Sequence, residues 1–298
     1  MAARTILITG ANTGIGAACA RTLAGPDVHL VLACRSEDKT APVLAELRAR
    51  GAKACFLSLD LADLTSARAC ARAFVEEHPR LDLLINNAGL AGSRGKTKDG
   101  FELAFGTNHL GHHELTLSLL PALEAARGRV VNVSSGNHYF AKRFELDGVR
   151  EATRSTTGLA EYSFSKLCNV LFTAELRRRH PSVEATSVHP GRIASDIWRR
   201  VPWPFRAWLP TLLAMKTVDE GARPLLVASE TPAQELPLYF HGLRPRGANP
   251  LALREDHAKA LWDFSEAACL EALGPRVADK ARTNGASTHG TARGALLS

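Results

Sequence analysis

A tyrosine and a lysine stand four residues apart in the stretch YSFSK, at Tyr162 and Lys166. If this stretch is helical, the two side chains lie one above the other on the same face. An ammonium group beside a phenol favours the phenolate and lowers the pKa of the phenol from its usual value of about 10. The pair could therefore donate or accept a proton near neutral pH, although a surface tyrosine and a solvated lysine can have the same spacing.

Three glycines follow an apolar run near the N-terminus, at Gly10, Gly14 and Gly16 in the stretch TGANTGIG. Glycines between a strand and a helix permit a tight turn, a close approach of the backbone to a pyrophosphate, and close packing of helix on sheet. The spacing G-x-x-x-G-x-G differs from the commoner G-x-G-x-x-G, and such turns also occur without ligands. This turn predicts a site for the phosphates of a dinucleotide.

The end of the second apolar run indicates which dinucleotide binds. NAD-selective sites place an acidic residue there for the ribose 2′-hydroxyl, whereas an arginine suits a 2′-phosphate. The run ends in LACRSE, with Cys34 at the acidic position and Arg35 after it. The sequence therefore predicts NADP(H), the alternative being that Arg35 is an ordinary surface residue.

Apolar runs typical of buried strands alternate with helical segments along the chain. Strands are expected at 5–9, 28–33, 53–59, 81–86, 129–133, 183–189 and 237–242. Helices are expected up to about 23, near 40–50 and 65–78, over 101–126 with breaks at Gly106, Gly111 and Pro121, and from about Glu161. This alternation predicts an α/β fold: a single Rossmann-type doubly wound parallel sheet with helices on both faces. We expect one domain over residues 1–275, followed by a disordered tail, 276–298, that is rich in small and polar residues.

From residue 4 to residue 195 the chain resembles the short-chain dehydrogenase/reductase family. Besides the glycine turn, the matching stretches are Asp60-Leu61, the NNAG turn at 86–89, TNHLGHHELT, VNVSS, YSFSK and SVHPG. Several of them look most like the retinol-dehydrogenase-like branch, which reduces retinoids and other apolar aldehydes or ketones with NADPH. Two departures from that branch are expected: the membrane anchor common there is not expected in this chain, and Ser195 stands where a threonine is often found.

The resemblance implies a catalytic set of Asn108, Ser135, Tyr162 and Lys166. Tyr162 would give a proton to the substrate oxygen, Lys166 would bind the nicotinamide ribose and keep the phenol acidic, and Ser135 would hydrogen-bond the developing alkoxide. Asn108 would hold a water between Lys166 and solvent. The residues expected at the cofactor are Gly10, Asn12, Thr13, Gly14, Ile15, Gly16, Arg35, Asp60, Leu61, Asn87, Ala88, Gly89, Tyr162, Lys166, Pro190, Gly191, Ile193 and Ser195.

The segment 197–215 holds three of the four tryptophans and follows the position where the family carries a variable substrate lid. We expect a lid at about 195–235, with Ser135, Tyr162 and Trp198 touching the substrate and an apolar wall around it. Two other interpretations stay open: an ordinary core helix, or a basic amphipathic patch that makes weak contact with a membrane surface.

Composition narrows the function classes. The net charge of +7 lacks the aromatic and basic pattern of a nucleic-acid binder, and no apolar run approaches the roughly 20 residues of a membrane span. No metal is expected, because the cysteines lack C-x-x-C pairs and H-x-x-H-H at 109–113 lacks the spacing of H-E-x-x-H. Without a signal-peptide pattern, a cytoplasmic location is expected.

The expected function is that of an NADP-dependent oxidoreductase acting on a small apolar carbonyl or alcohol, such as a retinal-like aldehyde or ketone. Two alternatives remain: a hydroxysteroid or polyketide ketoreductase, and a catalytically silent NADP(H)-binding sensor or scaffold. An intact Asn108, Ser135, Tyr162 and Lys166 favours an enzyme over a sensor. An oligomer is compatible with the sequence, which does not specify one.

Overall fold

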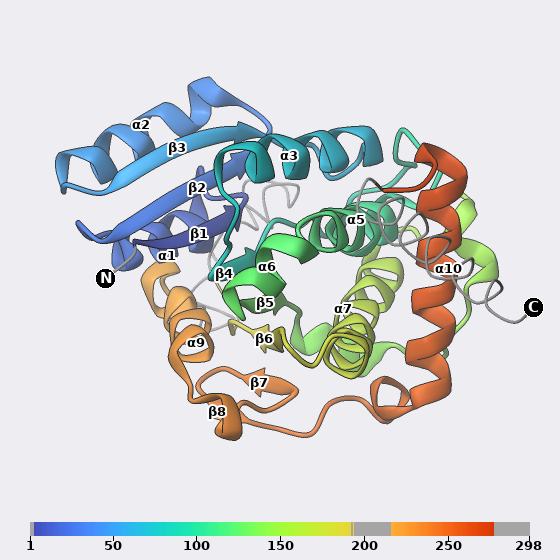
Figure 1. Ribbon diagram of the computed structural model, residues 1–298. Helices are drawn as coiled ribbons and strands as arrows, with labels where there is room; N and C mark the ends of the chain where they lie inside the picture. Colours follow the sequence, from blue (N-terminus) through green and yellow to red (C-terminus); the bar gives the residue numbers. More distant parts are fainter. Residues whose placement is uncertain (1–2, 192, 194–215, 277–298) are drawn as a thin grey trace, which may run out of the picture.

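An eight-stranded sheet forms the centre of the computed structural model, which describes residues 3–191, 193 and 216–276 (Figure 1). The strands are β1 (Arg4–Thr9), β2 (Val28–Cys34), β3 (Lys53–Ser58), β4 (Leu83–Asn86), β5 (Arg129–Val133), β6 (Glu184–His189), β7 (Tyr239–His241) and β8 (Arg244–Pro245). Their order is β3-β2-β1-β4-β5-β6-β7-β8, and every pair is parallel except β7 with β8. The predicted doubly wound α/β fold is confirmed, with a short antiparallel strand added at one edge.

Helices cover both faces of the sheet because successive strand residues point to opposite sides. One face buries Ile6 and Ile8 beneath α1 (Gly14–Leu23), α2 (Glu37–Ala49) and α9 (Val218–Glu230). The other face buries Leu7 beneath α3 (Leu64–Glu77), α5 (Gly111–Ser118), α6 (Leu120–Ala126) and α7 (Leu159–Arg179). Single-turn helices lie at Gly136–Phe140, Asp147–Arg150, Ala233–Glu235 and Pro250–Leu253.

The helix expected over 101–126 is divided differently from the prediction. It consists of α4 (Leu103–Phe105), a π-helical segment η1 (Gly106–Leu110), α5 and α6. Gly111 does not break the helix; a Cβ atom there would lie 2.4 Å from the carbonyl oxygen of Leu61, so glycine allows a close approach. The break lies just before Pro121, which occupies the first turn of α6.

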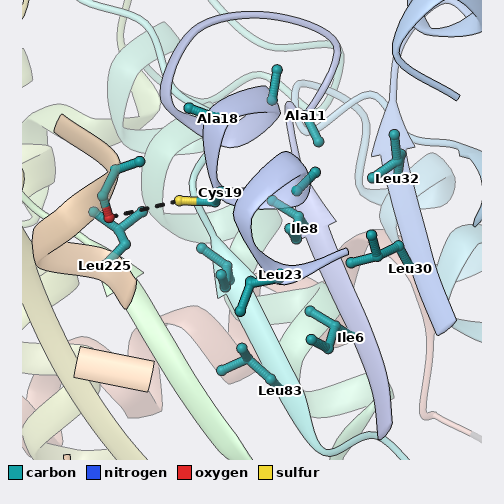
Figure 2. Close-up of a cluster of buried hydrophobic side chains, with 14 of the residues drawn as sticks. Ile6, Ile8, Ala11, Ala18, Cys19, Leu23, Leu30, Leu32, Leu83 and Leu225 are labelled. Atoms are coloured by element: carbon teal, nitrogen blue, oxygen red, sulfur yellow. Dashed lines mark hydrogen bonds between the residues drawn. The ribbon is translucent and has the colours of Figure 1, made fainter. Parts of the chain in front are cut away.

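Helix α9 occupies most of the second half of the range expected for a substrate lid. A reciprocal capping box between Thr217 and Glu220 starts it. Its residues Ala222 and Leu225 are buried against α1 and the sheet, where the Cys19 thiol points to the carbonyl oxygen of Ala222 at 3.9 Å (Figure 2). Residues 218–230 are therefore a core helix, because their apolar side covers the sheet.

Another helix, α10 (Glu255–Leu273), was not expected from the sequence and packs outside α7 (Figure 1). Just beyond it lies Arg276, the first residue of the tail that the sequence predicts to be disordered. Its guanidinium is instead buried, 2.6 Å from a carboxylate oxygen of Glu114 and 2.9 Å from one of Glu266. The ion pairs hold this end of the domain against α5 and α10.

No helix in the described part of the chain is both long and apolar enough to span a bilayer.

Candidate active site

The carboxyl ends of the parallel strands meet at one edge of the sheet, and the predicted site residues follow them. Gly10 follows β1, Arg35 follows β2, Asp60 follows β3, and the turn 87–89 follows β4. Ser135 is the second residue after the end of β5. Ligands of open parallel sheets bind at this edge, where the order of the strands reverses beside β1.

The glycine turn after β1 has the geometry that the sequence predicts. Gly10 and Gly14 have φ angles of +66° and +58°, in the left-handed region that favours glycine. A Cβ atom on Gly16 would lie 2.6 Å from Nδ2 of Asn87, so no side chain fits there. On Gly14, in contrast, a Cβ atom would meet nothing within 4 Å. The turn therefore packs tightly against the Asn87 side chain at Gly16. At Gly14, where α1 begins, no protein atom lies close to it.

The Thr9 hydroxyl ties this turn to the one after β4. Its Oγ1 accepts hydrogen bonds of 2.9 Å from the backbone N–H groups of both Asn87 and Ala88. It also lies 3.0 Å from Nε2 of His112, whose Nδ1 lies 3.0 Å from the carbonyl oxygen of Asn108. Because a carbonyl only accepts, Nδ1 carries the hydrogen and Nε2 accepts from Thr9. The sequence prediction missed Thr9 and His112, although His112 lies one helical turn after Asn108.

Tyr162 and Lys166 lie in the first part of α7, and both are buried, with 8% and 3% of their surfaces exposed. The Lys166 nitrogen is 5.8 Å from the centre of the Tyr162 ring and donates to the carbonyl oxygen of Val133 at 2.8 Å. The Ser135 side chain interacts with Tyr162 and accepts a bond from the backbone N–H of Asn137 at 3.2 Å. The structure therefore brings Ser135, Tyr162 and Lys166 together.

Burial dominates the electrostatics of this group. It raises the pKa of Tyr162 above its ordinary value, and the hydrogen bond to Ser135 opposes that shift. Burial also lowers the pKa of Lys166 to about 7, because the ammonium is removed from water. The sequence predicts a lowered pKa for Tyr162 because of Lys166; in the structure burial raises this pKa instead, and only the hydrogen bond to Ser135 acts against that shift.

Asn108 lies at the π-helical segment and is completely buried. Its Oδ1 accepts from the backbone N–H of Leu90 at 2.9 Å, and its Nδ2 donates to the Leu90 carbonyl and to Ser165 Oγ. The side chain thus fastens the loop after β4 to α7, one residue from Lys166. The expected water between Lys166 and solvent stays a prediction.

The end of β2 presents a buried thiol and an exposed cation. The Cys34 side chain is buried beside the backbone of the glycine turn, including Gly10, and burial raises its pKa. Arg35 is exposed at the same edge. After β3, the Asp60 carboxylate accepts a hydrogen bond of 3.0 Å from the backbone N–H of Ala62, and this bond stabilises the loop between β3 and α3.

A cavity of about 680 Å³ lies next to the Ser135 end of the site. Its lining among the described residues includes Gly136, Tyr139, Phe140, Gly191 and Leu243. Pro190 and Ile193, expected at the cofactor, are buried beside Gly191.

Ser195, Trp198 and the segment 197–215 lie outside the described residues.

The other two histidines of H-x-x-H-H make separate contacts. Nε2 of His109 lies 2.9 Å from Ser265 Oγ, and Nε2 of His113 lies 2.9 Å from a carboxylate oxygen of Glu266. Both rings point toward α10. The His109 contact joins the π-helical segment η1 to α10, and the His113 contact joins α5 to α10. Neither ring contacts a residue of the candidate active site through these bonds.

Comparison with known proteins identifies the class of protein. The pattern of the short chain dehydrogenase family matches residues 4–146. Human retinol dehydrogenase 12 is 38% identical over 271 residues, which cover 88% of this chain and 85% of that protein. Human retinol dehydrogenase 11 is 38% identical over 270 residues, covering 88% and 84%. The chain belongs to the short-chain dehydrogenase family of oxidoreductases, and its similarity is to the retinol-dehydrogenase-like branch.

Solved structures agree with this fold. An uncharacterized protein from Mycobacterium Paratuberculosis has a TM-score of 0.69 and 33% identity, covering 89% of this chain and 93% of that chain. A metagenomic short-chain oxidoreductase in complex with NADP has a TM-score of 0.59 at 23% identity, covering 82% and 97%. The second likeness concerns the fold alone.

Proposed function

We propose that this protein transfers a hydride between NADP(H) and an apolar carbonyl or alcohol, with Tyr162 as the general acid and base. The observation that carries the proposal is the buried group of Ser135, Tyr162 and Lys166 at the edge that also holds the glycine turn. A carbonyl reductase requires a proton donor close to the site where its dinucleotide binds, and this edge of the sheet has both a candidate donor and a glycine turn suited to the phosphates.

The surroundings of Lys166 fit a dinucleotide. Its ammonium has three N–H donors, of which the carbonyl oxygen of Val133 takes one. Within the described part of the chain no carboxylate pairs with it. A Cβ atom on Gly89 would lie 3.5 Å from Nζ, so glycine keeps this side of the ammonium clear. The hydroxyls of a nicotinamide ribose would satisfy the remaining donors, and the open side of Gly14 would hold the phosphates.

Three side chains would carry the proton chemistry. The nicotinamide, when bound, supplies or accepts the hydride. Tyr162 Oη would give its proton to the substrate oxygen during reduction and take it back during oxidation. Ser135 would hydrogen-bond the same oxygen as charge develops on it. Lys166, charged when it binds the ribose, would lower the pKa of Tyr162 and so offset the effect of burial.

The preference for NADP(H) rests on Cys34 and Arg35. A neutral buried thiol at the end of β2 neither repels a 2′-phosphate nor accepts from a 2′-hydroxyl as a carboxylate would. The exposed guanidinium of Arg35 is free to approach a phosphate from the solvent side.

The similarity to retinol dehydrogenases supports a retinal-like aldehyde or ketone as substrate. The 680 Å³ cavity beside Ser135 is lined by apolar side chains such as Tyr139, Phe140 and Leu243 and by the cations Lys216 and Arg244, which supports a substrate with an apolar body and a polar end. The cytoplasmic location expected from the sequence stays a prediction.

The test is to follow NADPH absorbance with a panel of apolar aldehydes, ketosteroids and quinones. We expect the fastest turnover with long apolar aldehydes, and faster turnover with NADPH than with NADH. Faster turnover of ketosteroids would favour the hydroxysteroid alternative. Tight NADPH binding with no turnover of any compound would favour the sensor and contradict the proposal.

A further inference from the structure

Two histidines and a cysteine gather at the opposite end of the sheet from the candidate active site. They are His29 near the start of β2, Cys55 on β3 and His78 directly after α3. One ring nitrogen from each histidine and the Cys55 sulfur all lie within 4.8 Å of one another. All three residues are half-buried, so the cluster can be reached from solvent.

The topology brings these residues together from three separate elements. In the parallel ladder His29 pairs with Lys53 and Val31 with Cys55, so the side chains of His29 and Cys55 share one face and lie diagonally adjacent. Helix α3 runs back across this face and ends beside the starts of the strands. There the His78 ring meets the His29 ring edge-on, with centroids 4.5 Å apart.

Few other described groups interact with the polar atoms of this cluster. Among the described residues no hydrogen bond acts on the His29 ring or the Cys55 thiol, and the charged groups that do act on them are Lys53, Arg48 and Glu77. The nearest carboxylate is Glu77, whose Oε2 lies 3.9 Å from Nε2 of His78 and whose side chain is 72% exposed. Glu77 is therefore free to turn toward the cluster or to leave room for a water.

We propose that His29, Cys55 and His78 bind one zinc ion, with Glu77 or a water as the fourth ligand. Two imidazoles and a thiolate are ligands that zinc prefers, and four-coordinate tetrahedral geometry is its usual choice. Bonds of the usual lengths to one sulfur and to nitrogen or oxygen place tetrahedral ligands about 3.3–3.6 Å apart, so small side-chain rotations would bring the three ligand atoms to these distances. As the sulfur–zinc bond forms, the Cys55 thiol releases its proton to solvent.

This site would be structural and separate from the reaction. His29 lies five residues before Cys34, which is about 16 Å along the strand at the usual rise per residue. An ion there would clamp β2 and β3 to the end of α3. The inference therefore does not depend on the proposed reaction.

The direct test is a titration of the full chain, freed of any affinity tag, with zinc alone and then with cobalt(II) alone. We expect one zinc per chain, release of a proton on binding, and a rise in the thermal unfolding midpoint. Cobalt should give a thiolate-to-metal charge-transfer band in the near ultraviolet. Magnesium and calcium, which prefer oxygen ligands, should have no effect.

Substitutions assign the ligands. Cys55→Ser should abolish the charge-transfer band, and Cys55→Ser or His29→Gln should each weaken zinc binding by at least roughly tenfold. His257→Gln is the matched control. His257 is also half-buried, but its ring stacks on Phe144 and it does not belong to the cluster. The substitution should leave binding unchanged. Absence of the band in the unmodified protein, or equal zinc affinity in Cys55→Ser and His257→Gln, would overturn the proposal.

Discussion

The ammonium nitrogen of Lys166 lies 2.8 Å from the carbonyl oxygen of Val133, two residues before Ser135. This contact fixes α7 against the end of β5, so the strand that delivers the serine also positions the lysine. The same carbonyl accepts a second bond from Nδ2 of Asn169 at 3.1 Å. Two side chains of α7 thus bind the same backbone oxygen of β5, which holds this helix and this strand of the candidate active site together.

The buried lysine should cost the protein stability. Burial lowers the pKa of Lys166 to about 7, whereas an unfolded lysine titrates near 10.4. The cost is fully present below about pH 7 and is relieved as the pH rises toward 10, because the unfolded chain then binds more protons than the folded one. Lys166→Met should therefore raise the free energy of unfolding by roughly 1–3 kcal/mol near pH 6, and by less near pH 9.

Urea unfolding at the two pH values measures this change. Asn169 continues to satisfy the Val133 carbonyl in Lys166→Met, so the substitution leaves no unpaired acceptor there. Lys166→Arg keeps the buried charge and serves as the control that should not gain stability. A loss of stability in Lys166→Met at both pH values would show that the lysine stabilises the fold.

The hydrogen bonds that join Thr9 to His112 and His112 to Asn108 should stabilise the turns after β1 and β4, where we propose that the cofactor binds. His112→Phe removes both hydrogen bonds of the ring and leaves the Thr9 hydroxyl and the Asn108 carbonyl in a buried region. It should lower the free energy of unfolding by about 1–3 kcal/mol. Dinucleotide binding should weaken several-fold, because Thr9 orients the backbone of Asn87 and Ala88.

A double-mutant cycle with Thr9→Val measures the interaction between Thr9 and His112 separately from other destabilising effects of each substitution. If the two residues act as a unit, the double variant should lose less stability than the sum of the single losses. Additive losses in stability and in dinucleotide affinity would mean that His112 and Thr9 act independently.

The ion pair of Arg276 should contribute strongly to stability. The Glu114 side chain is fully buried and is shared by Arg276 and Arg68, each at 2.6 Å. Arg276→Met leaves that carboxylate with one cation and should cost roughly 2–4 kcal/mol. The control is Arg254→Met, which breaks an exposed pair with Asp256 and should cost less than about 1 kcal/mol. Equal losses in urea unfolding would contradict a structural role for Arg276.

The strands and the order of site residues were predictable because they depend on local signals. Buried parallel strands are continuously apolar, and the glycine turn and the Tyr–Lys spacing are short motifs. The missed helices also left signals. Thr217 and Glu220 form a capping box, and the buried residues of α10, such as Ala258, Leu261 and Trp262, follow a helical spacing.

The remaining features depend on contacts between distant residues. The pairing of Arg276 with Glu114 joins residues 162 positions apart, and the Thr9–His112 contact joins residues 103 apart. Such contacts form only once the sheet brings the elements together. The raised pKa of Tyr162 likewise follows from burial in the assembled fold, which its spacing from Lys166 does not reveal.

The dinucleotide preference should reverse when the end of β2 is changed. Cys34→Asp with Arg35→Val places a carboxylate where it accepts from a ribose 2′-hydroxyl and repels a 2′-phosphate. The ratio of kcat/KM with NADPH to that with NADH should fall by at least roughly tenfold, since one charged contact is lost and a repulsion is added. Arg35→Val alone should give a smaller change in the same direction. An unmodified enzyme that already prefers NADH would contradict the role of Arg35.

The central claim is that Tyr162 transfers the proton, and Tyr162→Phe tests it most directly. Phenylalanine keeps the buried ring and removes only the hydroxyl that interacts with Ser135. The measurement is kcat with the best aldehyde of the panel, alongside NADPH affinity from fluorescence titration. We predict that kcat falls by roughly 10²-fold or more while NADPH affinity stays within about threefold of the unmodified protein. Near-full turnover by Tyr162→Phe would contradict the account.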